Sequence, residues 1–387
     1  MMMAKIRSSS TACTRSRPAP GNAVTIPDSL NMKTRCKHTH VGSQWFMREA
    51  IDHYLKGKRN RHDVKRWLER NPGLDAAALR LAEGIQTGRI RFQPIRYFNR
   101  VEPISGKHRV IGRESVEQQI CDHAAVIALQ PLIKARLGRW QTATIKGRGI
   151  IDSKRAIERW LHDKRSRYFA KLDVIHYYPS IDRPTLMRML DHDIGDATLL
   201  RLIWILISTH RGTNGLNIGS YLSQTLGNYY LAGAYHYALG EWKPRRGKRV
   251  RLASHVLFYM DDMMLLGRDK RDVRMCAHRL ESYLDQMLHL KVHEGWDVGR
   301  VGADQLDMVG FRFTPNRTTL RPELFLRARR AFKRADKSMC RTRALRCSSY
   351  YGWLKNSDNI RFRRRNHIDR IQRRASRMLS KRKERKQ

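Results

Sequence analysis

The chain has 387 residues and carries 78 Lys and Arg against 35 Asp and Glu, a formal net charge of +43. This length can bury a sizeable core in two or three subdomains, and this charge indicates a polyanionic partner. No run of about 18 apolar residues is present to span a bilayer. The six scattered cysteines form no framework of close pairs. We therefore predict a cytoplasmic protein without a membrane partner.

The N-terminal 40 residues predict a disordered basic arm. They are rich in Ser and Arg and have no apolar h-region, which excludes a secretory signal peptide. A transit peptide, or residues upstream of a start at Met32, are the alternatives. The stretch Cys36-Lys-His38-Thr-His40 contains metal-binding side chains, but its spacing matches no common zinc module.

The next part of the chain alternates between helical and extended patterns. Apolar residues at helical spacing predict helices over 45–69, 75–85, 116–137 and 151–163. Two extended runs between 90 and 111, with a Ser-Gly turn at 105–106, predict strands. A Gly-Arg-Gly sequence marks a loop at 147–149.

From Tyr168 the sequence is rich in β-branched and aromatic residues, which predicts a strand that ends in a turn at Pro179. Two short apolar runs between 255 and 266 predict a β-hairpin, and 306–313 predicts a further strand. Helices are expected after the first strand up to 207, over 222–239 and over 271–290. This order favours an α+β fold with a small antiparallel sheet backed by helices.

The C-terminal segment from Arg321 holds 24 Lys and Arg and only five Asp and Glu. Aromatic residues interleave with this charge up to Arg363, as expected of a segment that both packs and contacts phosphates. The final stretch predicts a solvated basic tail.

Two adjacent carboxylates, Asp261 and Asp262, stand in the apolar stretch VLFYMDDMMLL. Like charges at a hairpin tip repel each other unless a cation lies beside them, so a Mg²⁺ site is one explanation and an acidic β-turn is the other. Asp173 ends the other β-rich run, and antiparallel pairing would bring it beside Asp261. Three carboxylates at strand ends can hold two Mg²⁺ ions about 4 Å apart, which activates an attacking oxygen and stabilises a leaving pyrophosphate.

These residues resemble the reverse transcriptase family. Tyr259-Met-Asp-Asp262 matches the family's Y-x-D-D signature, and Asp173 in KLDVIHYYPSID matches its first catalytic aspartate. Gly219-Ser-Tyr-Leu-Ser-Gln224, followed by Asn228, matches its G-x-x-x-S template and nucleotide contact. The resemblance extends over roughly residues 90–313 through three further stretches: GKHRVI (106–111), KGRG (146–149) and MVGF (308–311).

The resemblance implies an α+β right-hand polymerase with fingers, a ferredoxin-like palm and a helical thumb. The expected divisions are a disordered basic arm (1–40), fingers (41–165), palm with the catalytic carboxylates (166–315), thumb (316–365) and a basic C-terminal tail (366–387). The remaining residues show no carboxylate or His/Asn cluster for an RNase H or endonuclease domain.

Roles for individual residues follow from the same resemblance. Asp173 and Asp261 correspond to the metal ligands and Asp262 to a supporting catalytic carboxylate, with two Mg²⁺ ions as cofactor and Mn²⁺ as an alternative. Tyr178 corresponds to the aromatic residue that would collide with a 2′-hydroxyl, which implies dNTPs as substrates; a core tyrosine is the alternative reading.

Basic side chains are candidates for holding the triphosphate, because its charge needs guanidinium or ammonium partners. Arg109 is the best single choice among Lys107, Arg109, Lys146 and Arg148. Further candidate substrate contacts are Ile218, Gly219, Ser223, Gln224 and Met260. The candidate nucleic-acid contacts are Lys146, Arg148, Asn228, Gly310 and Trp353.

The sequence departs from the wider family at two places. Ile218 and Gln224 replace the Gln and Pro that flank the G-x-x-x-S motif in many members, and an apolar residue at 218 should loosen discrimination between bases. This I-G-x-x-x-S-Q form resembles reverse transcriptases of diversity-generating retroelements and of bacterial groups linked to phage defence. His293 lies near the position of a family lysine thought to protonate pyrophosphate, so Lys291 and His293 are both candidates.

The predicted activity is RNA-directed DNA synthesis from a primer 3′ end. The expected partners are an RNA template or structured noncoding RNA, a DNA primer or cDNA product, dNTPs and an accessory protein. A template-independent or protein-primed DNA-synthesising relative is one alternative. A non-catalytic RNA-binding scaffold is another, and a missing carboxylate would have favoured it. Retroelement and anti-phage defence roles stay open.

Overall fold

The structure is a computed structural model that describes residues 33–101 and 108–384. The predicted arm up to residue 32, the predicted turn at 105–106 and Lys107 lie outside these residues. Within the described ranges, no helix combines the length and apolar character needed to cross a membrane. Residues 33–40 were expected to belong to the arm. Instead the backbone of Arg35 forms an isolated β-bridge with that of Ile194. The buried Cys36 Sγ donates a hydrogen bond to the Ala128 carbonyl at 3.3 Å.

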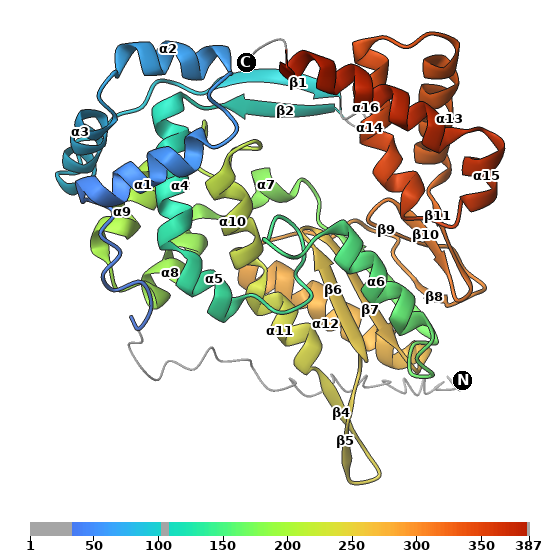
Figure 1. Ribbon diagram of the computed structural model, residues 1–387. Helices are drawn as coiled ribbons and strands as arrows, with labels where there is room; N and C mark the ends of the chain where they lie inside the picture. Colours follow the sequence, from blue (N-terminus) through green and yellow to red (C-terminus); the bar gives the residue numbers. More distant parts are fainter. Residues whose placement is uncertain (1–32, 102–107, 385–387) are drawn as a thin grey trace, which may run out of the picture. The chain divides into compact units, whose positions relative to one another are not determined.

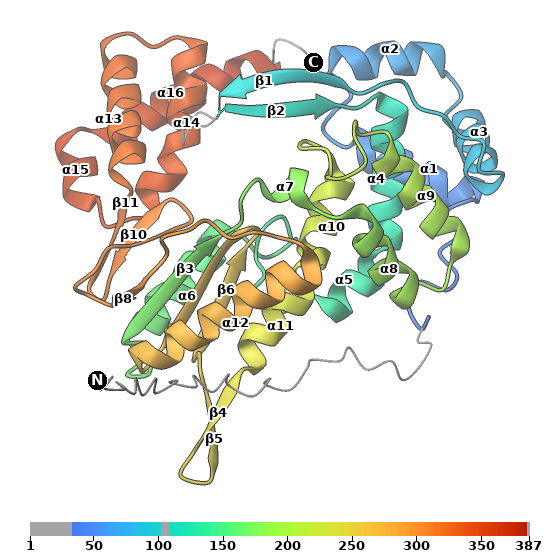
Figure 2. The ribbon, with the colours of Figure 1, turned by 180° about the vertical axis from the view of Figure 1, so that it is seen from behind.

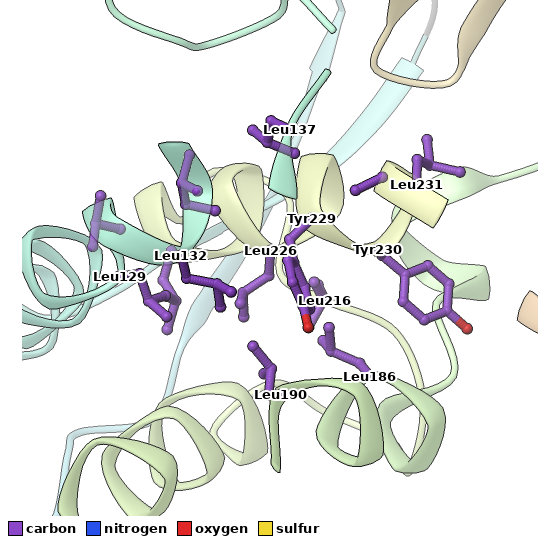
Figure 3. Packing of buried hydrophobic residues seen from close by; sticks show 14 of the residues in the cluster. Leu129, Leu132, Leu137, Leu186, Leu190, Leu216, Leu226, Tyr229, Tyr230 and Leu231 are labelled. Carbon is purple, nitrogen blue, oxygen red and sulfur yellow. The ribbon is translucent and has the colours of Figure 1, made fainter. Parts of the chain in front are cut away.

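Helices dominate the first half of the chain, where α1 packs against α3 and α4, and α4 packs against α9 and α10 (Figure 1). The helices are α1 (Gln44–Leu55), α2 (His62–Arg70), α3 (Leu74–Gln86), α4 (Val116–Ala128), α5 (Gln130–Arg136), α8 (Arg183–Asp193), α9 (Ala197–Ser208) and α10 (Tyr221–Tyr230). Figure 3 shows leucines of α5, α8 and α10, among them Leu132, Leu190 and Leu226, pointing toward one another in the core of this part.

Three predicted helical stretches are each broken in two. The stretch over 45–69 forms α1 and α2, which lie on either side of residues 56–61. The helix expected over 116–137 divides at Leu129, because Pro131 has no N–H to continue the helical hydrogen bonds. The helix expected over 222–239 divides at Leu231 into α10 and α11 (Ala232–Gly240). The break redirects α11 so that it packs against α12 (Lys270–Leu288) and β6.

The central sheet has four strands in the order β6-β7-β3-β8, with every neighbouring pair antiparallel. Its strands are β3 (Tyr168–Asp173), β6 (His255–Tyr259), β7 (Asp262–Gly267) and β8 (Val298–Arg300). The predicted hairpin between 255 and 266 is confirmed as β6 and β7. Helix α12 packs against β3, β7 and β8, and α6 (Ile150–Leu161) contacts β6 (Figures 1 and 2).

Both faces of this sheet are buried. Ala170, Leu172 and Met263 face one core, which includes α12. Phe169 and Met264, which alternate with them along the strands, face a second core that includes α6 and the C-terminal helices. Because alternate residues of a strand point to opposite faces, burial of both faces requires continuous apolar runs. This explains why the residues around Asp261 and Asp262 lack a polar alternation.

The C-terminal part begins with a small sheet in the order β11-β10-β9 and continues with helices (Figure 2). Its elements are β9 (Leu306–Met308), β10 (Phe311–Thr314), β11 (Arg317–Leu320), α13 (Pro322–Lys337), α14 (Arg341–Lys355), α15 (Ile360–Arg365) and α16 (Ile368–Glu384). The single strand expected over 306–313 was wrong. Val309 and Gly310 have φ of 46° and 85°, and this left-handed turn separates β9 from β10.

The solvated tail expected after residue 366 is instead helix α16, which packs against α14 and α13. Ile368, Ile371 and Ala375 are buried. These residues recur at helical spacing and form an apolar stripe along a highly basic helix, which the dominant charge of this segment obscured.

Two hairpins lie outside these sheets. The strands β1 (Arg96–Val101) and β2 (His108–Arg113) form the first and confirm extended structure in part of the range 90–111. The second consists of β4 (Trp242–Arg245) and β5 (Lys248–Arg251), which the sequence analysis did not anticipate. After β3 the chain turns through His176 (φ 47°) into the single-turn helix α7 (Tyr177–Ser180).

Candidate active site

Antiparallel pairing places two carboxylates side by side, because Asp173 at the end of β3 is the register partner of Asp262 at the start of β7. Asp261 lies next to them in the two-residue turn between β6 and β7. The sequence predicted Asp173 beside Asp261, which is one residue away from the observed partner. Met260 begins this turn with φ of 59°, a conformation that hairpin turns usually assign to glycine. Backbone strain of this kind clusters at functional sites.

The charge of Asp173 raises the proton affinity of the two neighbouring carboxyls, Asp261 and Asp262. Burial, together with the charges of Asp173 and Asp262, raises the pKa of Asp261 to about 6, although its own backbone amide and Arg109 act in the opposite direction. Burial also raises the pKa of Asp262, and the charges of Lys171 and Arg321 lower it. Negative charge is therefore concentrated here with incomplete compensation from the protein.

Lys171 is a site residue that the sequence analysis missed. Its Nζ forms an ion pair with Asp262 Oδ1 at 3.2 Å. The strand sequence YFAKLD could have indicated this residue. Residues two apart on a strand share a face, so Lys171 lies on the same face as Asp173. Cross-strand register then brings that face to Asp262.

The carboxylates fit a hard divalent cation. All their donors are oxygens, and the buried Oδ1 of Asp262 has the Lys171 ammonium at 3.2 Å as its ion-pair partner but no well-directed hydrogen bond. The described residues contain no group of three or more His, Cys, Asp or Glu side chains already arranged as a complete metal site. Mg²⁺ in polymerase-type sites commonly takes one or two carboxylates and completes its coordination with substrate phosphates and water. The arrangement therefore suits a cation that arrives with a phosphorylated substrate.

Tyr178 and Arg109 lie within electrostatic reach of these carboxylates. Burial and the charge of Asp261 raise the pKa of Tyr178, whereas the charge of Arg109 lowers it. Tyr178 is half-buried, and its neighbour Tyr177 is the core residue, with its hydroxyl donating to the Gly227 carbonyl at 2.5 Å. Arg109 comes from the exposed strand β2. An aromatic side chain and a guanidinium from two different elements are thus coupled electrostatically to Asp261.

The segment with the G-x-x-x-S motif adjoins β2. The Gly112 backbone N–H donates to the Ile218 carbonyl at 3.1 Å. Gly219 has φ of 120°, and a Cβ there would lie 3.0 Å from Ile111 Cγ2. Ser220 then caps α10 by accepting from the Ser223 N–H at 3.1 Å. Ile218 is therefore presented at the junction of β2 and α10.

The remaining candidate substrate contacts offer few exposed polar atoms. Ser223 is buried and Gln224 is half-buried on α10, one turn further along. Met260 is also buried, in the turn that carries Asp261. These three residues therefore contribute to the site mainly through their backbone and their packing.

A buried polar network supports this junction from behind. Asn217 Nδ2 donates to the Gly112 carbonyl at 3.1 Å and to Glu114 Oε1 at 2.8 Å. The Ser220 hydroxyl donates to Asp122 Oδ2 at 2.6 Å. Burial raises the pKa of Glu114 and, further, that of Asp122, where the charge of Glu114 adds to the effect. Nothing in the sequence pointed to these residues, because their contacts join positions about a hundred residues apart.

Two predicted nucleic-acid contacts are engaged inside the protein. Asn228 is buried, with its Nδ2 donating to the Ala143 carbonyl at 2.8 Å and to Thr144 Oγ1 at 3.1 Å. Arg148 Nη1 donates to the Gly138 carbonyl at 2.6 Å. Both side chains thus brace the loop that exposes Lys146. Lys146 is exposed, whereas Asn228 and Arg148 make the hydrogen bonds that hold this loop; contact with nucleic acid stays a prediction for all three.

Gly310 and Trp353, two further predicted nucleic-acid contacts, touch each other. A Cβ at Gly310 would lie 2.7 Å from Trp353 Cζ3, and the Trp353 ring centroid lies 5.3 Å from that of Phe311. The turn between β9 and β10 therefore packs on α14, and the two residues form one unit.

The candidate general acids lie beside the carboxylate strand. The His293 N–H donates to the Asp173 carbonyl at 2.9 Å, and the Ile175 N–H donates to the Lys291 carbonyl at 2.8 Å. Both side chains are exposed. The segment is close to Asp173, and the choice between Lys291 and His293 stays open.

Comparison with known proteins gives one family. The family model described as reverse transcriptase (RNA-dependent DNA polymerase) matches residues 99–295. That range contains β2, the three carboxylates and the junction at Ile218. No curated protein matches the sequence.

Proposed function

The chain belongs to the reverse transcriptase family, and we propose that Asp173, Asp261 and Asp262 carry its RNA-directed DNA synthesis. The observation that supports this assignment best is the pairing of Asp173 with Asp262, with Asp261 in the adjoining turn. The reaction adds dNTPs to the 3′ end of a primer. Its class is nucleotidyl transfer.

The carboxylates have separate roles in this proposal. Asp173 and Asp261 offer oxygen ligands for two Mg²⁺ ions, with Mn²⁺ as an alternative. When bound, these ions activate the primer 3′-hydroxyl and stabilise the charge on the leaving pyrophosphate. Asp262 is held by the ion pair with Lys171, which keeps the strand end in register with Asp173.

Substrate choice falls to residues around the carboxylates. Tyr178 would lie against the sugar and exclude a 2′-hydroxyl, and Arg109 would hold the triphosphate together with Lys107. Electrostatic coupling of Asp261 to both Tyr178 and Arg109 supports this placement. Ile218 would meet the base pair with an apolar side chain, which provides no hydrogen bond to select bases. Lys291 or His293 would protonate the pyrophosphate.

The RNA partner is supported by charge in the described surface. A cavity of about 510 Å³ is lined by five arginines of α2, β1, β2 and the segment before β1, and by three carboxylates, Asp63, Glu114 and Glu117. The arginines are Arg66, Arg70, Arg91, Arg96 and Arg113. Guanidinium groups at this density suit phosphates of an RNA template or a structured noncoding RNA. The Gly310 and Trp353 unit would contact the primer end, next to the basic helices α13 to α16.

We propose the domain divisions and the biological setting that the sequence resemblance implies. We assign fingers to about 41–165, palm to 166–315 and thumb to 316–365, and α16 extends this last part. The I-G-x-x-x-S-Q sequence supports a bacterial retroelement or anti-phage defence system, with an accessory protein as a further partner. A cytoplasmic setting is consistent with the five described cysteines, all of which are unpaired.

Primer extension tests the proposal. We expect the protein to extend oligo(dT) on poly(rA) with Mg²⁺ and dTTP, and the Asp261→Asn, Asp262→Asn variant to lose extension while keeping the thermal midpoint. Equal extension by this variant would exclude the assigned site. Products whose sequence does not follow the template would favour a template-independent enzyme. RNA binding without extension, with or without co-purified RNA, would favour a scaffold.

A further inference from the structure

The hairpin β4–β5 stands apart from the central sheet. Both views show it projecting from the chain between α11 and β6 (Figures 1 and 2). Its ten residues, 242–251, include six Lys and Arg and no Asp or Glu. Two strands alone are marginally stable, and like charges at this density repel one another. A surface of this composition therefore needs an explanation other than its own folding.

Neither face of the hairpin is built to pack on a protein core. Register places Trp242, Pro244, Arg249 and Arg251 on one face and Lys243, Arg245, Lys248 and Val250 on the other. Trp242 is 38% exposed, and its ring is covered by the Arg249 guanidinium at 4.4 Å from the centroid. Protein interfaces rely on buried aromatic and aliphatic anchors, and this hairpin offers none that is free.

The turn presents a cation at an energetic cost. Arg246 and Gly247 form the two-residue turn with φ of 49° and 73°. Turns of this kind favour Asn, Asp or Gly at the first position, because a side chain in the left-handed region costs about 1 kcal/mol or more. Arg246 adopts this conformation despite its cost, and it places a guanidinium at the tip of the hairpin.

The base of the hairpin is fixed, so the cations have a defined direction. The Leu252 N–H donates to the Glu241 carbonyl at 3.0 Å. Lys243 forms an ion pair with Asp272 of α12. The remaining cations have no carboxylate partner among the described residues; these are Arg245, Arg246, Lys248, Arg249 and Arg251.

The hairpin and the carboxylates lie at opposite ends of β6. The strand begins at His255, shortly after the hairpin, and ends at Tyr259, beside the turn that carries Asp261. Five residues of strand span about 17 Å. Nucleic acid at the hairpin is therefore a different segment from the one that is copied at the carboxylates.

We propose that the hairpin β4–β5 binds the phosphate backbone of double-helical RNA that lies apart from the primer terminus. Duplex RNA is favoured over single strands, because single-strand sites stack bases on several free aromatic rings and the one ring here is occupied by Arg249. The identification of the polyanion as RNA rests on the proposed function. Duplex DNA offers the same phosphate chemistry, so it forms a separate arm of the test.

The test removes charge from the tip and measures salt dependence. The variant is Arg245→Gln, Arg246→Gln, Lys248→Gln, Arg249→Gln, and the ligand is a blunt RNA duplex, with duplex DNA of the same sequence in parallel. Each lost phosphate contact should reduce the slope of log K against log salt by about 1. We expect a slope smaller by about 3 to 4, affinity weaker by about tenfold or more, and a stronger effect on RNA than on DNA.

Two further variants make the result specific. Arg245→Lys, Arg246→Lys, Arg249→Lys keeps the charge and should keep the slope. A shortened hairpin, with Asn-Gly in place of residues 244–249, joins the register partners Lys243 and Val250 directly and should reproduce the loss. Because no core contact is removed, primer extension on a short poly(rA)/oligo(dT) hybrid should stay at the wild-type rate in all three variants.

Each outcome bears on the proposal separately from the polymerase assignment. Unchanged affinity and slope in the neutral variant would overturn the proposal and leave an acidic protein surface as the partner. Equal losses for RNA and DNA would overturn its RNA specificity. Absence of primer extension in the wild-type protein would instead count against the proposed function, whatever the hairpin binds.

Discussion

Gly112 in β2 and Ile218 before α10 are joined by a backbone hydrogen bond of 3.1 Å. The strand that carries Arg109 is thereby tied to the segment that presents Ile218. Asn217, Glu114 and Asp122 form a buried network behind this bond. The position of the residues that we propose to face the nucleotide thus depends on groups that need not touch it.

A side chain at residue 112 should separate these elements. In Gly112→Ala the new Cβ would lie 2.1 Å from Asn217 Oδ1 and 2.7 Å from Ile95 Cγ2. We expect KM for dTTP to rise several-fold and stability to fall by about 1–3 kcal/mol. Steady-state primer extension and denaturant unfolding measure the two effects. Gly240→Ala is the matched control, because nothing lies within 4 Å of its Cβ. An unchanged KM at position 112 would contradict the positioning role.

The Glu114 and Asp122 pair should make stability depend on pH. Burial raises the pKa of both carboxyls in the folded state, so the folded protein holds protons that the unfolded chain releases above about pH 4. This contribution is therefore complete at low pH and is lost as pH rises toward the folded-state pKa values. Asp122→Asn cannot ionise and should remove part of the decline, as measured by unfolding between pH 5 and 8.

Two further substitutions, one at Asp122 and one at an exposed carboxylate elsewhere, serve as controls for that result. Asp122→Leu leaves the Ser220 hydroxyl without its acceptor and should cost about 1–3 kcal/mol at every pH. Asp297→Asn, at an exposed ion pair with Arg274, should leave the neutral to alkaline decline unchanged. A pH profile in Asp122→Asn that superimposes on the wild-type profile would show that the pair is ionised in the folded protein.

Gly310 and Trp353 should behave as one energetic unit. Gly310→Ala meets the Trp353 ring at 2.7 Å and also has an unfavourable φ of 85°, so both steric and backbone costs apply. In a Trp353→Ala background the steric cost disappears and only about 1 kcal/mol of backbone cost remains. We expect the double mutant to be more stable than the sum of the single effects predicts, by about 1–2 kcal/mol in a double-mutant cycle. Strict additivity would contradict the contact.

Much of the carboxylate site could be predicted from local sequence. The alternating strand before Asp173 and the paired apolar runs around Asp261 define a hairpin and a neighbouring strand, because strand and turn signals are short-range. The exact partner was not predictable. Whether Asp261 or Asp262 opposes Asp173 depends on a one-residue choice of register, which the turn at Met260 decides.

The residues that could not be predicted depend on long-range packing. Asn228 and Arg148 matched family motifs or carried the expected charge, but burial turned their polar atoms toward the chain's own carbonyls. In α16 the basic residues suggested solvation, but three buried apolar residues at helical spacing decided the outcome. Helix breaks at Leu129 and Leu231 likewise follow from where the next helix must pack.

Tyr178 should set the preference for deoxynucleotides. Tyr178→Val removes the ring, so KM for UTP on poly(rA)/oligo(dT) should fall by about tenfold or more, whereas KM for dTTP changes less. Tyr178→Phe keeps the ring and should keep the wild-type discrimination. The measurement is the ratio of kcat/KM for dTTP and UTP in each protein. Equal ratios in the wild-type and Tyr178→Val proteins would show that Tyr178 packs in the core and does not select the sugar.

Ile218 should loosen base selection because its side chain cannot hydrogen-bond the nascent base pair. We expect Ile218→Gln to lower misincorporation opposite template adenine by several-fold, with little change in the kcat for the correct dTTP. Sequencing of products copied from a mixed RNA template measures this frequency for each base. Ile218→Leu is the matched control, since it keeps an apolar side chain of equal size and the backbone bond to Gly112. If the Gln and Leu variants misincorporate at the wild-type frequency, base selection lies elsewhere, and the junction between β2 and α10 serves only to hold Arg109 in place.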